Sequence, residues 1–170
     1  MVADAMLLCG KQYSFDEVRE YFSSLTWDNT PRLDSWLSMV FGVDDDEYYR
    51  SVGSNWLKGL VKRALHPGSK FDYVLVIEGK QGIKKSTAIA TLASPWHTET
   101  VMTPDNKDFF INLIGNLVVE FAEGETLSRG EMKKLKAVIT MTHDDLRLPY
   151  GRMTARFPRR CVFAMTTNEE

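Results

Sequence analysis

A short stretch near the middle of the chain combines glycines, lysines and a hydroxyl at a spacing that suits phosphate binding. Residues 79–86 read GKQGIKKS. A phosphate-binding loop needs backbone amides that converge on the anion, a lysine for the β/γ-phosphate oxygens and a hydroxyl for Mg²⁺. Gly79 and Gly82 let the backbone turn closely around an anion, while Lys85 and then Ser86 supply the lysine and the hydroxyl. The residues predicted to bind a nucleoside triphosphate are Gly79, Lys80, Gln81, Gly82, Ile83, Lys84, Lys85, Ser86 and Thr87.

One position of this loop departs from the strict GxxxxGK[ST] pattern. Lys84 stands where the last glycine is expected. A side chain there adds a second cation and either strains the loop or shifts the phosphates. The alternative interpretation is an ordinary strand-to-helix turn with solvated lysines. The apolar run YVLVI at 73–77 predicts a strand before the loop, and a helix is expected from Lys85, so the phosphate-binding interpretation is favoured.

Two acids and an amide follow later apolar runs. Glu120 and Glu123 lie at the end of LVVEF (117–121), and Asn168 follows VFAM and two threonines. In P-loop enzymes an acid at the C-terminal end of a neighbouring strand holds Mg²⁺, and a second carboxylate often orients the attacking water. An amide at Asn168 would orient this water or contact the γ-phosphate; the alternatives are solvated glutamates and an ordinary turn asparagine. The catalytic candidates are Lys85, Glu120, Glu123 and Asn168, and the metal-ligand candidates are Ser86 and Glu120.

The C-terminal part of the chain is locally basic. Residues 146–168 contain five arginines and no acid, although the whole chain has a formal net charge of −2, which excludes a uniformly basic nucleic-acid binder. A guanidinium here could stabilise charge on a γ-phosphate in a neighbouring subunit, or could grip a nucleic-acid backbone. The alternative is a solvated basic face. The candidates are Arg147, Arg152, Arg156, Arg159 and Arg160.

The spacing of apolar residues predicts the elements that must position these side chains. Capping-box patterns begin helices at Ser14 and Ser128, the second of which runs to about Thr140. Further helices are expected at 33–41, from 47 to 66, from 85 and over 108–114. Buried strands are expected at 73–77, 117–121 and 162–165, and a hairpin is expected from 147–150 and 153–157. This alternation predicts an α/β fold with a parallel sheet, divided into a tail (1–13), a helical cap (14–70) and a core (71–170).

Several classes of site and location are not indicated. Cys9 and Cys161 lack metal or redox spacing and are expected to be reduced and buried, and His66, His97 and His143 are isolated in the sequence. No apolar run is long enough for a membrane span, and the N-terminus does not resemble a signal peptide. A cytoplasmic location and no membrane partner are therefore expected.

The ordered series of motifs resembles the virulence-associated protein E family. The resemblance extends from about residue 14 to the end of the chain and is carried by WDxxPRLDxWL at 27–37, Pro67-Gly68, the loop at 78–86, VVEFAE at 118–123 and TTN at 166–168. Members are phage- and island-encoded proteins related to superfamily-3 and poxvirus-type primase-helicase ATPases.

This resemblance implies a P-loop NTPase core of the AAA+/superfamily-3-like type. Lys85 and Ser86 match the Walker A pair, Glu120 and Glu123 the Walker B acids, and Asn168 the sensor-1 asparagine. It further implies an ATPase module that uses ATP and Mg²⁺ in a homo-oligomeric mobile-element replication protein. The hairpin at 147–160 would face single-stranded DNA, and a neighbouring subunit would donate an arginine. Because the chain ends two residues after Asn168, the core is expected to be incomplete at its C-terminus.

Two other functions remain open. Lys84 and the short C-terminus suit a weak or inactive P-loop domain that oligomerises or binds a host replication partner. A small P-loop kinase is less favoured, because neither a lid nor an acceptor-binding motif is recognisable in the sequence.

Overall fold

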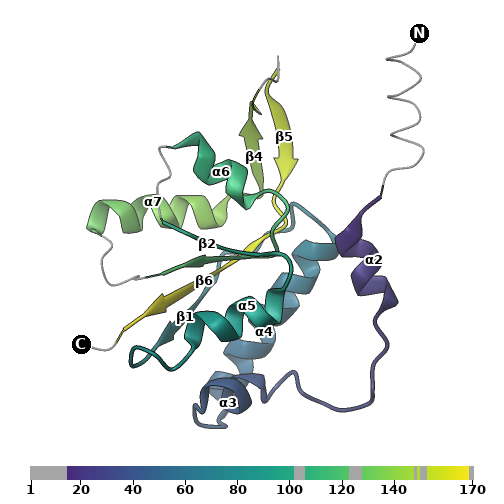
Figure 1. The fold of residues 1–170 in the computed structure, drawn as a ribbon, viewed down its shortest axis with the longest axis vertical. Helices are drawn as coiled ribbons and strands as arrows, with labels where there is room; N and C mark the ends of the chain where they lie inside the picture. Colours follow the sequence, from purple (N-terminus) through teal and green to yellow (C-terminus); the bar gives the residue numbers. More distant parts are fainter. Residues whose placement is uncertain (1–14, 102–105, 123–127, 148, 150–152, 169–170) are drawn as a thin grey trace. The chain divides into compact units, whose positions relative to one another are not determined.

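The computed structural model describes residues 15–101, 106–122, 128–147, 149 and 153–168. The chain divides into two units, Met1–Thr30 and Pro31–Glu170. Within the described ranges, no helix combines the length and the apolar composition needed to cross a membrane. The helices and strands in chain order are α2 (Glu17–Ser24), α3 (Trp36–Phe41), α4 (Glu47–Leu65), β1 (Val74–Glu78), α5 (Lys85–Ala93), β2 (His97–Thr100), α6 (Lys107–Leu113), β3 (Val118–Phe121), α7 (Arg129–Thr140), β4 (His143–Leu146), β5 (Ala155–Pro158) and β6 (Val162–Thr167) (Figure 1).

The first unit contributes one described helix, α2. Its N-cap is Asp16, whose carboxylate accepts a hydrogen bond from the backbone N–H of Arg19 at 3.1 Å. The helix begins later than its pattern predicts, because Asp16 is its N-cap, and the expected cap at Ser14 lies outside the described residues. An aspartate suits this position because its side chain satisfies a backbone N–H that has no partner within the helix.

Four strands form a parallel sheet in the order β1-β6-β3-β2. β6 pairs with β1 on one side and with β3 on the other, which places Glu78 opposite Thr167 and Phe121 opposite Met165. Because the strands are parallel, their C-terminal ends meet at one edge of the sheet. The expected α/β class with a parallel sheet is confirmed, as are the three apolar strands. The sequence does not predict β2, because HTET forms no apolar run.

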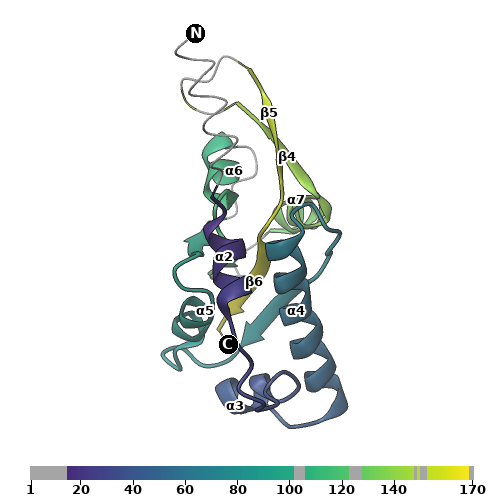
Figure 2. The same ribbon diagram turned by 90° about the vertical axis from the view of Figure 1, so that its right-hand side faces the viewer.

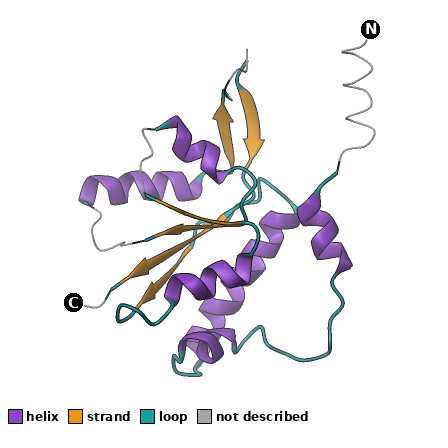
Figure 3. Ribbon diagram, in the orientation of Figure 1, coloured by secondary structure: helices purple, strands orange, loops and turns teal. Residues whose placement is uncertain are grey.

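The main hydrophobic core covers one face of this sheet. Its rings lie one above another, since Phe121 stacks against Phe109 of α6 and against Phe163 of β6. Burial of each such side chain contributes roughly 1.5–3 kcal/mol to folding. Figure 3 shows the helices around the sheet and the hairpin as a separate strand pair. The buried residues of this core are Phe109, Leu113, Val119, Phe121, Leu135, Val138, Ile139, Cys161, Phe163 and Met165.

Helix α4 packs on β1 and β6, while α5 lies on the opposite side of the sheet (Figure 2). The α4 helix begins at an N-cap, Asp46, as its acidic run predicts, and its Trp56 indole donates to the Phe163 carbonyl at 3.0 Å. The Trp36 ring of α3 stacks on Trp56 with centroids 6.1 Å apart. These contacts hold α3 and α4 in the same unit as the sheet, whereas the sequence assigned them to a cap that ends at residue 70.

The predicted hairpin exists and its second strand overlaps the expected one, but its first strand lies earlier in the chain. β4 and β5 pair antiparallel, with His143 opposite Pro158 and Leu146 opposite Ala155. The strand expected at 147–150 is therefore four residues earlier, because Asp144 and Leu146 turn inward and are buried there. The expected turn at Gly151 and Arg152 lies outside the described residues. The preceding helix, α7, has the predicted capping box between Ser128 and Glu131 and ends at Thr140, as expected.

Candidate phosphate-binding site

The loop between β1 and α5 begins at the C-terminal edge of the sheet. The N–H of Gly79 donates to the carbonyl of Thr167 at 3.3 Å, which joins the start of the loop to the end of β6. Gly82 has φ 87°, a left-handed conformation that favours glycine. Lys84 also has a left-handed backbone, with φ 64° and ψ 33°. The lysine at this position therefore follows the backbone path that a glycine adopts readily.

The N-terminus of α5 has no side-chain cap. Its N-cap is Lys84, no side chain bonds to its first N–H groups, and its first turn contains no acid. The first hydrogen bond within this helix runs from the N–H of Ala88 to the carbonyl of Lys84. The amides of the first turn thus lack acceptors inside the helix and carry a partial positive charge. Such an end attracts anions.

Lys85 lies at this helix end with its ammonium turned into the protein. Its side chain is buried, at 7% exposure. The Nζ atom donates to the carbonyls of Gly79 at 2.5 Å and Lys80 at 3.1 Å, and to Oδ1 of Asn168 at 3.2 Å. All three acceptors are neutral oxygens, and no carboxylate is paired with Lys85 among the described residues. The structure thus brings Asn168 to Lys85 across 83 positions of sequence.

A hollow with a volume of about 340 Å³ opens beside this lysine. Of the loop residues predicted to bind a nucleotide, Gly79, Lys80 and Ile83 do not line it. The ends of β3 and β6 close its other side. The lining residues are Gln81, Gly82, Lys84, Lys85, Ser86, Thr87, Ala122, Thr166 and Asn168.

Glu120 does not line this hollow. Its side chain is fully buried. The Oε2 atom lies 3.0 Å from Nε2 of His97, and Oε1 accepts from the Thr166 hydroxyl at 2.9 Å. In the sequence His97 is isolated, because it lies in a polar stretch 23 residues before Glu120. Glu123, the second predicted acid, lies outside the described residues.

The donors for a metal ion are few in the described part of the site. Among these residues no cluster of three His, Cys, Asp or Glu side chains could hold a metal ion. The residues that line the hollow offer neutral oxygens only, from the hydroxyls of Ser86, Thr87 and Thr166 and the amides of Gln81 and Asn168. Mg²⁺ commonly retains several waters and takes one or two carboxylates together with the phosphates of its substrate. This set suits an ion that arrives with a nucleotide, held by Ser86, better than a resident metal.

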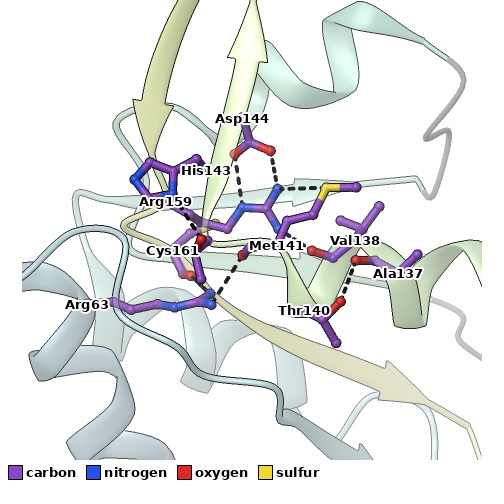
Figure 4. A network of polar contacts seen from close by, with 10 residues as sticks. Arg63, Ala137, Val138, Thr140, Met141, His143, Asp144, Arg159 and Cys161 are labelled. Carbon is purple, nitrogen blue, oxygen red and sulfur yellow. Dashed lines mark hydrogen bonds and ion pairs between the residues drawn. The ribbon is translucent and has the colours of Figure 1, made fainter.

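The predicted arginines occupy different environments. Arg159 is buried at 2% exposure; its Nε donates to Asp144 at 2.9 Å, a second N–H bonds the same carboxylate, and a third donates to the carbonyl of Val138 (Figure 4). Neither DNA nor another subunit reaches a guanidinium in this position. Arg156 is exposed and paired with Asp145 at 2.8 Å, which lowers the pKa of that carboxyl through a side-chain hydrogen bond.

The remaining candidates differ in how they can be placed. Arg147 is exposed and Arg160 is partly buried. Arg152 lies outside the described residues. Arg147, Arg156 and Arg160 therefore remain as described candidates for contacts outside the chain.

A second buried arginine, which sequence reasoning did not single out, lies below the hairpin. Arg63 of α4 is fully buried and donates to the carbonyls of Cys161 at 2.7 Å, Ser69 at 3.0 Å and Phe71 at 3.0 Å. Arg63, Asp144 and Arg159 are called the hairpin anchor here. The sequence does give one indication that Arg63 is buried: it lies on a face of α4 that otherwise carries small and apolar residues. The anchor ties α4 and β4 to the start of β6, which ends at the hollow.

Known proteins resemble this chain at two levels. A family model described as the virulence-associated protein E-like domain matches residues 22–170. An A-form apo structure of the NrS-1 C-terminal region has a TM-score of 0.56 and 20% identity, covering 85% of this chain and 35% of that one. Another apo structure of this region has a TM-score of 0.53 and 17% identity, covering 84% and 35%. The chain thus spans about a third of these structures' length, and the likeness concerns the fold. No curated protein matches the sequence.

Proposed function

This chain belongs to the virulence-associated protein E-like domain family, and from this premise we propose that it is a P-loop ATPase module of a mobile-element replication protein. In the proposal the module binds ATP with Mg²⁺, hydrolyses it, and couples hydrolysis to single-stranded DNA within a homo-oligomer. The protein acts in the bacterial cytoplasm, encoded by a prophage or a genomic island.

The observation that carries this proposal is the convergence on one hollow. The ammonium of Lys85, the uncapped first turn of α5 and the amide of Asn168 all lie beside the same 340 Å³ space, at the C-terminal edge of a parallel sheet. Ligands of open α/β sheets bind outside the carboxyl ends of the strands. A lysine and a helix N-terminus together favour a phosphate group. In the strand order β1-β6-β3-β2, the strand before the loop lies beside β6, the strand that Asn168 follows, which suits contact with a terminal phosphate.

The residues of the chain then take defined parts. Lys85 exchanges its carbonyl partners for the β/γ-phosphate oxygens, and Ser86 provides a hydroxyl for the metal. When bound there, Mg²⁺ would neutralise charge that develops on the phosphates. Asn168, which bonds to Lys85, would contact the γ-phosphate. Glu123 is the stronger candidate for the acid that meets metal or water, because the Glu120 carboxylate is engaged by His97 and Thr166.

The β4–β5 hairpin is the proposed contact to DNA and to neighbouring subunits. It projects from the sheet in Figure 1 and displays Arg147 and Arg156 at its surface. The hairpin anchor connects it to β6. A movement of the hairpin would therefore be transmitted along β6 to Thr166 and Asn168.

Turnover at increasing protein concentration tests this proposal. We expect Mg²⁺-dependent phosphate release whose rate per molecule rises with protein concentration, because a neighbouring subunit completes the site, and which single-stranded DNA stimulates. Arg147→Ala and Arg156→Ala distinguish two roles of the hairpin arginines. Loss of the stimulation by DNA would indicate a contact to DNA, and loss of turnover without DNA would indicate a contact to phosphate. Lys133→Ala on α7 is the charge-matched control. If the chain binds no ATP at any concentration, the proposal is wrong.

One observation favours a second candidate, a domain that binds nucleotide without hydrolysing it. Among the described residues, the hollow is lined by no carboxylate, and Ala122 directly follows the end of β3. Such a domain would serve to oligomerise or to bind a host replication partner. ATP binding with oligomer formation but no phosphate release, with or without DNA, would identify this function.

A further inference from the structure

A buried carboxylate connects three strands of the sheet below the phosphate loop. Glu120 of β3 lies opposite Glu99 of β2 and Ala164 of β6 in the strand register. Its partners are the diagonal neighbours, His97 two positions before Glu99 and Thr166 two positions after Ala164. Diagonal neighbours in a sheet are within reach only of long side chains. A glutamate can therefore span from the edge strand to the strand that borders the hollow.

Both oxygens of this carboxylate are occupied. Oε2 faces the His97 ring at 3.0 Å and Oε1 accepts from Thr166 at 2.9 Å. An ionised carboxylate accepts hydrogen bonds and donates none, so with Glu120 ionised it is Nε2 of His97 that carries the hydrogen in this contact. The His97 side chain is itself 14% exposed and that of Glu120 is not exposed at all. Direct contact of Glu120 with a nucleotide or its metal would require the loss of both hydrogen bonds in a buried place, which is costly.

Thr166 transmits this arrangement to the hollow. It is buried at 5% exposure and lines the hollow beside Asn168. Because its hydroxyl hydrogen is directed at Glu120, its oxygen can only accept hydrogen bonds from the side of the hollow. A water in the hollow would therefore donate a hydrogen to this oxygen. Its lone pairs would then point away from Thr166. The Glu120 carboxylate therefore determines that the Thr166 hydroxyl acts as a hydrogen-bond acceptor towards the hollow.

We propose that His97 and Glu120 are positioning residues that act through the hydroxyl of Thr166. Glu120 holds the hydroxyl in one orientation, and His97 holds Glu120 away from the hollow. In this proposal Glu120 orients the Thr166 hydroxyl at the edge of the site and does not bind the metal. This inference rests on the proposed nucleotide-binding function.

Two matched pairs of variants test it. Glu120→Gln retains both bonds, because its carbonyl accepts from Thr166 and its amide donates to the other tautomer of His97; Glu120→Ala loses both. We expect Glu120→Ala to lower kcat by about 10- to 100-fold with little change in the ATP concentration required, as for other residues that orient a site from behind. Glu120→Gln should retain most of the turnover and an unchanged Mg²⁺ requirement. Thr166→Ser should likewise retain turnover that Thr166→Val loses.

The histidine gives a readout that does not depend on turnover. In the ¹⁵N-labelled chain, the Nε2–H of His97 should give a slowly exchanging imidazole NMR signal that Glu120→Ala abolishes. Circular dichroism selects variants that remain folded. An active chain in which Glu120→Gln is as impaired as Glu120→Ala, or requires more Mg²⁺, overturns this inference alone. A chain that binds no nucleotide overturns the proposed function, and the histidine signal then decides whether the hydrogen-bonded network itself exists.

Discussion

The phosphate loop and the hairpin anchor both bury cations, but they use them differently. Arg159 of the anchor forms an ion pair with Asp144, and Arg63 distributes its donors over backbone carbonyls on every side. Lys85 of the loop also has neutral partners, but it borders a hollow and an uncapped helix end. Neutral partners alone therefore do not indicate a ligand, because Arg63 has them as well. The adjoining space with its unpaired amides distinguishes the loop.

This difference predicts which charged residues serve folding and which serve binding. The anchor's charges face only other parts of the chain, so their replacement should affect stability first. The loop's charge faces a space, so its replacement should affect binding first.

The largest effect is expected at Arg159. In Arg159→Met the Asp144 carboxylate remains buried without its partner, and loss of one member of a buried pair costs about 3–5 kcal/mol of unfolding free energy. Chemical denaturation measures this change. Arg156→Met, which removes an exposed pair with Asp145, is the control and should leave the unfolding midpoint nearly unchanged. Equal effects of the two substitutions would mean that the anchor does not hold the hairpin.

A smaller effect is expected from alkaline pH at the anchor. Burial raises the pKa of the Cys161 thiol from an ordinary 9.0 to about 11, although the nearby Arg159 and Arg63 oppose this shift. The folded state therefore keeps its proton where the unfolded state loses it, so stability is retained below pH 9 and falls as the pH rises from 9 towards 11. Unfolding free energies at pH 8 and 10 should differ by about 1 kcal/mol. Cys161→Ala should remove this part of the pH dependence; an unchanged slope contradicts it.

Replacement of Lys84 in the loop should increase the stability of the fold. A non-glycine residue in the left-handed region costs about 1–2 kcal/mol, and part of this is offset by the extra chain entropy of glycine in the unfolded state. Lys84→Gly should therefore raise the unfolding free energy by about 1 kcal/mol. It should leave ATP binding intact or tighten it. Lys80→Gly, which has no left-handed backbone to relieve, is the matched control and should be neutral or destabilising. A loss of stability on Lys84→Gly would show that the lysine side chain supports the loop.

The sequence predicts most of the fold where the signal is local. The capping box at Ser128 and the apolar runs of β1, β3 and β6 indicate their elements directly. The strand β2 is missed, because a four-residue strand of His and Thr has no apolar pattern to detect. The hairpin is displaced, because the pattern around Arg147 is also compatible with a strand and only tertiary burial of Asp144 and Leu146 selects the earlier register.

The candidate site is predictable in part for the same reason. The loop motif and Asn168 follow from residue type and position at strand ends, and the structure brings them together. The partnership of Glu120 with His97 does not follow, because strand order alone makes them neighbours. The burial of Arg159 does not follow either, since a sequence shows no sign that its carboxylate partner lies 15 residues earlier on a paired strand.

The central claim is that Lys85 is a cation held ready for an anionic ligand. The most direct measurement is the unfolding free energy of the chain and of Lys85→Met, each with and without MgATP. The substitution alone should change stability by about 1 kcal/mol or less, the net value of ordinary hydrogen bonds. MgATP at 100 times its Kd should stabilise the original chain by about 2.7 kcal/mol and should leave the variant unchanged. If MgATP stabilises both proteins equally, or neither, Lys85 is not the phosphate-binding residue and the account fails.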